Sequence, residues 1–361
     1  MMSSLKSNSS VVEPGGAVTN SQQTENHAAE KRVRAHGSAA QGTAIVLFTF
    51  LTVLAGMLGP MQSSVNGRLG VAVDDGHLAA CISFFSGLVV MFIIVLPQRR
   101  LRKALISIPG HLRRGTLPWP YFFAGLCGAV IVLSEGVSVG ALGVATFQTS
   151  LIAGMVISGI ICDRFGIGVE FKQALNIPRI LGALLAIAAT VLVVSPNFTA
   201  PHMIALAILP FCGGLLAGWQ PAGNSKIGYL ADSMLVSITW NFIIGFSALA
   251  LAFIIRLAMG AATFHLPSQW WMYLGGPLGL LSIALMALLV RKLGLLLLAL
   301  ASTAGQLIGS ILIDLILPQE GHVIYAVTVA GAAVALVAAG IAMVPSRKLG
   351  AGTEHKTEEA H

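Results

Sequence analysis

Between residues 44 and 344 the sequence consists almost entirely of apolar runs of about twenty residues, separated by Pro, Gly or charged residues. A helix needs about 20 apolar residues to cross a hydrocarbon core of about 30 Å. A membrane-spanning helix also satisfies its backbone hydrogen bonds within the segment. The sequence therefore predicts an all-α integral membrane protein with ten transmembrane helices, near residues 44–64, 78–97, 119–137, 143–162, 178–195, 203–222, 234–257, 270–290, 294–317 and 323–344.

The scarcity of charge excludes a soluble protein. Charged residues make up 10% of the chain and hydrophobic residues 56%, whereas about a quarter of a soluble domain is charged. The net charge of +7 does not indicate a nucleic-acid partner, because the basic residues lie in short gaps between apolar runs and form no recognition motif. It favours anionic membrane lipid as their partner.

The two ends of the chain differ from this apolar body. Residues 1–43 are rich in Ser, Asn, Gln, Ala and Glu, so we expect a disordered tail there, and a second polar tail over residues 346–361. The histidines and the four cysteines lack the spacing of a metal site. We therefore expect no metal and no cofactor.

The distribution of Lys and Arg predicts the orientation. With ten spans both tails lie on one side, and placing them in the cytoplasm puts 19 of the 21 basic residues inside. Only Arg68 and Arg256 remain outside. Because cytoplasmic loops carry an excess of Lys and Arg, we expect a multi-pass protein of the inner membrane with both termini cytoplasmic.

The sequence contains an internal repeat. Five pairs are 158 residues apart: Gln62/Gln220, Asn66/Asn224, Gly70/Gly228, Asp74/Asp232 and Ser83/Asn241. Six further pairs are 151 residues apart: Trp119/Trp270, Gly125/Gly276, Gly128/Gly279, Gly143/Gly294, Gly154/Gly305 and Asp163/Asp314. The chain thus divides into two five-helix repeats, residues 44–197 and 198–345.

These two repeats must have opposite orientations in the membrane, because five is an odd number of crossings. The charges agree: six basic residues follow the second span, whereas the equivalent gap after the seventh contains Arg256 alone. Inverted repeats are typical of secondary transporters. The sequence therefore indicates a transporter of a small molecule.

Several of these motifs resemble a known group. Gln62-x-x-x-Asn66-x-x-Leu69-Gly70, followed by Ser83-Phe84-x-x-Gly87, Gly143 and Asp163-x-Phe165-Gly166, is similar to the YdcZ-type branch of the drug/metabolite transporter superfamily. The resemblance implies ten helices in two inverted five-helix repeats of the DMT/EamA-like kind around a central cavity. Two departures suggest that the halves contribute differently: Gly305-Gln306 corresponds to Gly154-Met155, and the Asp-x-Phe-Gly ending is lost after Asp314.

Six amides are candidate substrate-binding residues. Gln62 and Asn66 share a helix face at a spacing of four, and Gln220 and Asn224 repeat the arrangement beside Pro221. A proline frees backbone carbonyls, and broken helices are where transporters hold substrates. The remaining candidates, deeper in their spans, are Asn241 and Gln306. Interhelical hydrogen bonds that serve packing are the alternative for all six.

Glu135 is the candidate for proton coupling, since it is the only carboxylate well inside a predicted span and its repeat partner is Met286. The alternative is a side chain that reaches the outer interface. For Asp163 and Asp314, at the ends of their spans, an interfacial cap or ion pair is favoured.

The leading hypothesis is a secondary transporter that moves a small metabolite, or an amphipathic or cationic compound, by alternating access. A channel or membrane assembly subunit is the alternative. An integral membrane enzyme is disfavoured because all nine histidines lie in tails or gaps. No nucleotide-binding P-loop is present, which argues against a self-contained ATP-driven pump. The sequence leaves the substrate, the direction of transport and the oligomeric state open.

Overall fold

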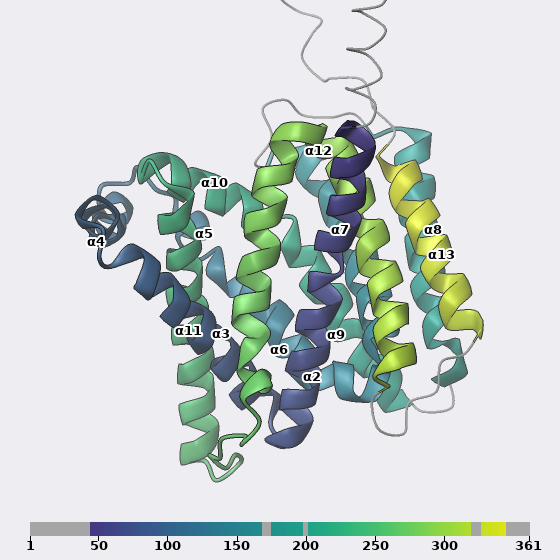
Figure 1. Cartoon of the computed structure of the whole chain (residues 1–361), viewed down its shortest axis with the longest axis horizontal. Coiled ribbons are helices and arrows are strands. Elements are labelled where there is room, and N and C mark those ends of the chain that lie inside the picture. The colour runs from purple at the N-terminus through teal and green to yellow at the C-terminus, as the bar shows by residue number, and fades with distance from the viewer. Residues whose placement is uncertain (1–43, 168–174, 198–200, 319–325, 344–361) are drawn as a thin grey trace, which may run out of the picture. The chain divides into compact units, whose positions relative to one another are not determined.

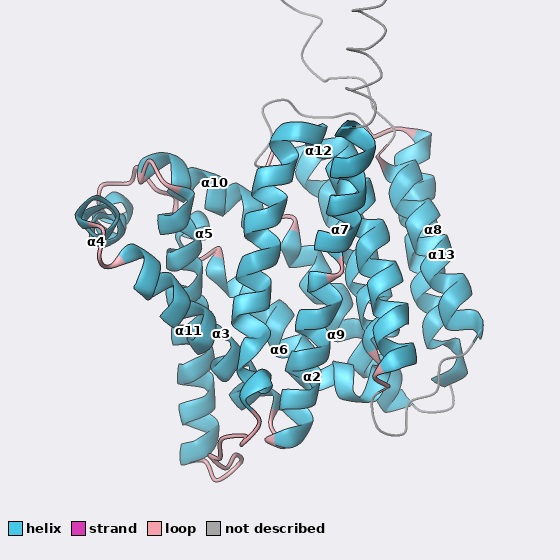
Figure 2. Cartoon of the chain, in the orientation of Figure 1, coloured by secondary structure: helices cyan, strands magenta, loops and turns pink. Residues whose placement is uncertain are grey.

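The computed structural model describes residues 44–167, 175–197, 201–318 and 326–343. The two predicted tails lie outside these ranges. Two compact units are distinguished, Met1–Phe48 and Thr49–His361, and only residues 44–48 of the first are described. Within the described ranges the chain forms helices joined by short loops, without a strand (Figure 2).

Figure 1 labels the helices of the larger unit. They are α2 (Leu58–Ala72), α3 (Gly76–Val95), α4 (Arg99–Arg113), α5 (Trp119–Phe122), α6 (Gly125–Leu142), α7 (Val144–Phe165), α8 (Ile177–Val194), α9 (Pro201–Ala217), α10 (Gln220–Leu230), α11 (Met234–Ala258), α12 (Gly275–Ile316) and α13 (Ala326–Ala342), with short 3₁₀ turns at Ser195–Asn197 and Trp270–Leu274.

The described helices agree with the predicted spans. In the part of the chain that the structure describes, nine segments are long and apolar enough to cross a membrane, beginning with Ala44–Ala72, and α13 is a tenth, shorter apolar helix. The third span begins at Gly125 rather than near residue 119, because the proline-rich residues 118–120 start the separate four-residue helix α5. The chain is an all-α membrane protein.

Backbone geometry repeats between the two halves. Asp74 and Asp232 both have φ of 48°, and they are the non-glycine residues with positive φ in the described chain. Gly143 separates α6 from α7 with φ 77° and ψ 163°. Gly294 interrupts α12 with φ 73° and ψ 168°. Residues 275–293 and 295–316 are therefore two helices, equivalent to α6 and α7.

Helices α3 and α11, which are equivalent in the two repeats, pack against each other in opposite directions. Asp75 at the start of α3 pairs with Arg256 near the end of α11 at 3.0 Å. Phe84 packs against its equivalent Phe242 in a tilted arrangement, with ring centroids 5.2 Å apart. An antiparallel contact between equivalent residues is what inverted repeats require.

Ion pairs between the halves secure both ends of α11. Asp75 accepts hydrogen bonds from the backbone N–H groups of His77 and Leu78 as well as from Arg256. Burial raises the pKa of Asp75, but the bonds from Leu78 and Arg256 outweigh it and hold this pKa below its usual value. At the other end, Asp232 pairs with Arg100 of α4.

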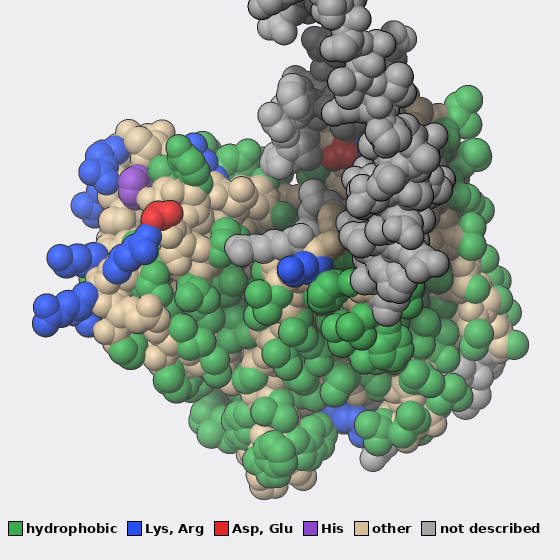
Figure 3. Space-filling view, turned by 45° about the horizontal axis from the view of Figure 1, so that its top comes forward, with side chains coloured by type: hydrophobic (Ala, Val, Ile, Leu, Met, Phe, Trp, Pro, Cys, Tyr) green, Lys and Arg blue, Asp and Glu red, His purple; other side chains and the backbone are tan. Residues whose placement is uncertain are grey.

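Helix α4 corresponds to the basic loop of the sequence. Its buried residues Leu101, Leu105 and Ile108 lie on one face and pack in the cluster that contains Ile227 and Trp240. Figure 3 shows Lys and Arg side chains gathered on the side where Figure 1 places α4. The apolar face of this amphipathic helix therefore packs on the protein itself.

Glycines allow two equivalent helix crossings. A Cβ on Gly154 of α7 would lie 2.1 Å from the carbonyl oxygen of Phe211 in α9, and one on Gly305 would lie 2.1 Å from that of Val53. Phe211 and Val53 are also 158 residues apart. Each repeat thus has a glycine that lies against the backbone of the other repeat, at equivalent positions.

We expect Gly154→Ala to destabilise the protein by roughly 1–3 kcal/mol, because the methyl group would force backbones apart. Gly159→Ala, on the same helix, is the matched control, since a Cβ there meets nothing within 4 Å. The measurement is thermal unfolding of both purified variants in one detergent. Equal melting temperatures would contradict the packing described here.

Candidate cavity at the boundary of the two repeats

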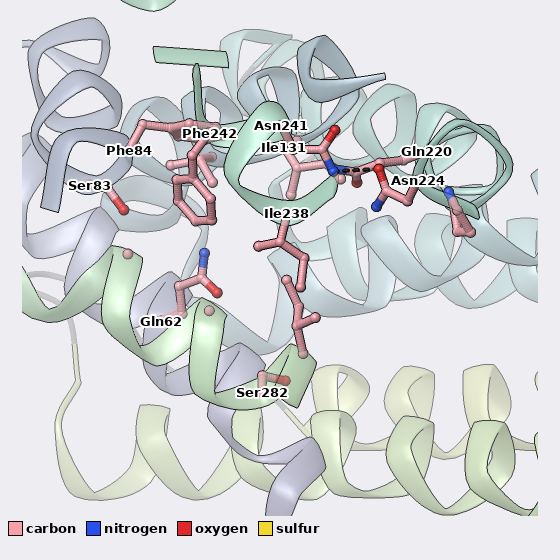
Figure 4. Close-up of a pocket in the computed structure, with 16 residues that line it drawn as sticks. Gln62, Ser83, Phe84, Ile131, Gln220, Asn224, Ile238, Asn241, Phe242 and Ser282 are labelled. Carbon is pink, nitrogen blue, oxygen red and sulfur yellow. Dashed lines mark hydrogen bonds between the residues drawn. The ribbon is translucent and has the colours of Figure 1, made fainter. Parts of the chain in front are cut away.

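A cavity of about 360 Å³ lies where the two halves meet (Figure 4). Its lining is contributed by helices of both repeats and contains amides, hydroxyls, aromatic rings and aliphatic groups. The residues are Gln62, Ser83, Phe84, Gly128, Ile131 and Val132 from the first half, and Gln220, Pro221, Asn224, Ile238, Asn241, Phe242, Gly276, Gly279, Ser282 and Ile283 from the second.

Most of this lining consists of equivalent pairs. At 158 residues apart are Gln62/Gln220, Ser83/Asn241 and Phe84/Phe242, and at 151 residues apart are Gly128/Gly279, Ile131/Ser282 and Val132/Ile283. The cavity therefore lies about the pseudo-twofold axis that relates the repeats. Transporters with inverted repeats bind substrate at such an interface.

Phe84 and Phe242 meet at this axis. A Cβ on Gly87 would lie 2.3 Å from the Phe242 ring, and a Cβ on its equivalent Gly245 would lie 2.2 Å from the Phe84 ring. Each ring thus occupies the space that a glycine of the opposite repeat leaves free. The two glycines allow α3 and α11 to approach closely beside the cavity.

The two glutamines are placed in the same reciprocal way. A Cβ on Gly279 would lie 2.7 Å from Gln62 Oε1, and one on Gly128 would lie 2.9 Å from Gln220 Nε2. Figure 4 shows the Gln62 side chain pointing into the cavity toward Phe242. Among the residues drawn there, the hydrogen bond joins Asn241 to Asn224, so both glutamine carboxamides are available to a ligand.

Asn66 is not among the residues that line the cavity, and its side chain bonds Glu135. Asn66 Nδ2 donates to Glu135 Oε2 at 2.6 Å, and Ser63 Oγ donates to Glu135 Oε1 at 2.8 Å. Gln148 Nε2 of α7 in turn donates to Ser63 Oγ at 2.9 Å. Glu135 is 4% exposed, so its carboxylate does not reach the protein surface as the alternative interpretation required.

Asn66 also lies between Glu135 and the cavity wall. A Cβ on Gly275 would lie 2.0 Å from Asn66 Oδ1 and 2.7 Å from the hydroxyl of the cavity residue Ser83. Asn66 Oδ1 is buried and has no hydrogen-bond partner in the described chain. In the second half the equivalent pair, Asn224 and Asn241, is hydrogen-bonded. Glu135, which has Met286 as its equivalent, thus holds Asn66 away from the pairing seen in the other repeat.

Comparison with known proteins decides the family. The family described as "Putative inner membrane exporter, YdcZ" matches residues 47–192 and again residues 205–343. The chain belongs to the YdcZ family. This YdcZ protein is therefore a multi-pass membrane transporter of the inner membrane, and the double match agrees with its two repeats.

Two other comparisons add no functional information. No curated protein matches the sequence. A solved structure titled "Crystal structure of protein" is 17% identical, covers 85% of this chain and 99% of its own, and has a TM-score of 0.47.

Gln306 of the YdcZ protein lies apart from the other candidate amides. It lines a second cavity, of about 610 Å³, between α7, α8, the second part of α12 and α13. At this cavity Asp163 pairs with Arg179 of α8 at 2.8 Å, which is one of the two roles expected for it, an ion pair. Asp314 has the other expected role, a helix cap, because it accepts hydrogen bonds from the first two backbone N–H groups of α7.

Sequence reasoning missed Ser63 and Gln148, which complete the Glu135 cluster, and the paired Phe84 and Phe242. The repeat offset aligned the two phenylalanines, but their ring type alone did not distinguish them from lipid-facing residues. Across the described residues, no group of three or more His, Cys, Asp or Glu side chains could hold a metal ion.

Proposed function

We propose that this YdcZ protein is a secondary transporter that carries a small amphipathic metabolite through the 360 Å³ cavity by alternating access, with Glu135 as the proton-binding residue. One observation carries the proposal: the cavity is lined by equivalent residues of two inverted repeats. Such repeats can exchange conformations and open a shared site to either side of the membrane.

A difference between equivalent aspartates supports alternating access. Asp314, 1% exposed, caps α7 through bonds to Val144 N at 2.9 Å and Ala145 N at 2.8 Å. The equivalent Asp163 pairs with Arg179 instead, and its side chain is 28% exposed at the second cavity. We infer that the helix cap made by Asp314 is closed in this state and that the equivalent cap by Asp163 is open.

The two repeats predict the second conformation, in which the equivalent aspartates exchange their roles. In that state Asp163 would cap the backbone N–H groups of Leu295 and Leu296, which follow Gly294 as Val144 and Ala145 follow Gly143. Asp314 would release α7. Each carboxylate favours the positive end of the helix that it caps, so exchanging the two caps would close one side while opening the other.

The test of the cavity uses Gln62→Leu and Gln220→Leu. We expect each variant to bind substrate at least tenfold more weakly at unchanged thermal stability, because the carboxamides touch the cavity rather than a protein partner. Ligands are found by thermal shift of the purified parent against a metabolite library. Unchanged affinity in both variants would assign the amides to packing, and flux that never saturates would favour a channel.

We further propose that both termini and α4 are cytoplasmic, where the basic residues of α4 would face anionic lipid. On a cysteine-free background, Thr116→Cys beside α4 should resist an impermeant thiol reagent added to intact cells, whereas His202→Cys at the start of α9 should react. Both positions are exposed. The reverse labelling pattern would invert the orientation.

A further inference from the structure

We propose that the substrate is an uncharged molecule with hydrogen-bonding groups at two opposite ends and an apolar body between them. This inference rests on the proposed function, because it takes the cavity between the repeats as the substrate site.

None of the described residues that line the cavity is charged. Its lining polar groups are the carboxamides of four Gln and Asn residues and the hydroxyls of Ser83 and Ser282. Glu135 does not line it, and the carboxylate oxygens already accept bonds from Ser63 and Asn66. Lys226 of α10 lies over the ring of Tyr229, 5.9 Å from its centroid. Burying an ion without an opposite charge costs several kcal/mol, so this lining selects against cations and anions alike.

The two glutamines define the two ends. Each carboxamide rests against a glycine of the opposite repeat, Gln62 on Gly279 and Gln220 on Gly128, so the pair is related by the pseudo-twofold axis. A carboxamide offers both a donor and an acceptor. Neither side chain has a hydrogen-bond partner among the residues drawn in Figure 4. A ligand with a donor or acceptor at each end would satisfy both carboxamides, and one lacking either group would leave a polar group unpaired.

Apolar groups between these ends define the middle. The rings of Phe84 and Phe242 and the side chains of Ile131, Ile238 and Ile283 line the rest of the cavity. Their contact area favours an apolar or aromatic body. A cationic substrate, which the sequence left open, would need a carboxylate in the cavity, and Glu135 is not among the lining residues.

The experiment uses purified full-length protein and triplets of compounds that share a carbon skeleton and differ in charge. One triplet, measured at pH 6 so that the amine is protonated, is N-acetylphenylalanine amide (uncharged), phenylalanine amide (cation) and N-acetylphenylalanine (anion). Affinities are measured for the parent, Gln62→Leu and Gln220→Leu, and cavity ligands are those weakened at least tenfold by either change. We expect the uncharged member of each binding triplet to bind at least tenfold more tightly than its charged partners.

A second test introduces a charge into the cavity and asks whether the preferred ligand changes accordingly. Gln220→Glu retains the size of the side chain and adds a carboxylate, so it should shift the preference at least tenfold toward the cation. Gly128→Ala should weaken binding without unfolding, because its methyl group displaces only the flexible end of Gln220. Gly159→Ala is the control for adding a methyl group.

The outcomes separate the two proposals. A charged ligand that binds most tightly and depends on Gln62 or Gln220 would overturn the uncharged substrate while leaving the cavity as the transport site. If no ligand depends on either glutamine, the cavity is not the substrate site, and both proposals fall.

Discussion

Glu135→Gln is expected to abolish the coupling of transport to a pH gradient. Glutamine preserves the size of the side chain and can still hydrogen-bond to Ser63 and Asn66, but it cannot ionise. Inside-out vesicles with an acidic lumen should accumulate the tightest ligand of the parent above equilibrium, because protons leaving the lumen drive substrate in. The variant should only equilibrate it across the membrane.

Two controls separate coupling from folding. Glu135→Asp keeps an ionisable group and should retain part of the gradient-driven accumulation. Ligand affinity of Glu135→Gln in detergent should stay within a few-fold of the parent, since Glu135 does not line the cavity. Equal gradient-driven accumulation by the parent and Glu135→Gln would remove this residue from the mechanism.

Asp314→Asn is expected to shift the balance between the two conformations by roughly 10- to 150-fold. The carboxylate accepts bonds from Val144 N and Ala145 N, and a hydrogen bond to a charged group contributes about 1.5–3 kcal/mol. Asparagine retains one acceptor oxygen and loses the charge. The start of α7 should therefore open far more often.

The matched variant is Asp163→Asn at the equivalent position. Asp163 lies near the end of α7 and pairs with Arg179 of α8 in this state. It is the cap that we infer for the opposite state, so its replacement should leave the start of α7 closed. The reporter is Thr146→Cys, 2% exposed in the first turn of α7. Its reaction with a small thiol reagent should accelerate with Asp314→Asn and not with Asp163→Asn. If both variants accelerate the thiol reaction equally, the proposed exchange of the two helix caps is refuted.

The ten spans and the repeat could be predicted because both depend on local sequence. Hydrocarbon requires a fixed length of apolar helix, and residue identity survives at constant offsets in the two halves. The break between α5 and α6 was missed, since the proline signal at residues 118–120 lies near the predicted start of the span. Where a helix starts depends on its neighbours as well as on its own residues.

The direction of individual side chains was harder to predict than the spans and the repeat. A spacing of four placed Gln62 and Asn66 on one helix face, yet Gln62 lines the cavity and Asn66 bonds Glu135. Residues four apart differ by about 40° around a helix, and two neighbouring helices can separate them. The partner of Asn66 lies 69 residues away, beyond any local pattern.

With Glu135 as the proposed proton-binding residue, its presence in only one repeat would limit the energy available to each cycle. A dimer of identical five-helix units would hold two such acids, whereas here the second position is Met286. Exchanging one proton for one uncharged solute moves a net charge, so the cycle would be electrogenic. A charge crossing 100 mV gains about 2.3 kcal/mol, which sustains a concentration ratio of roughly 50. Membrane voltage alone would then set a ceiling on the concentration ratio that a dimer with two such acids would exceed.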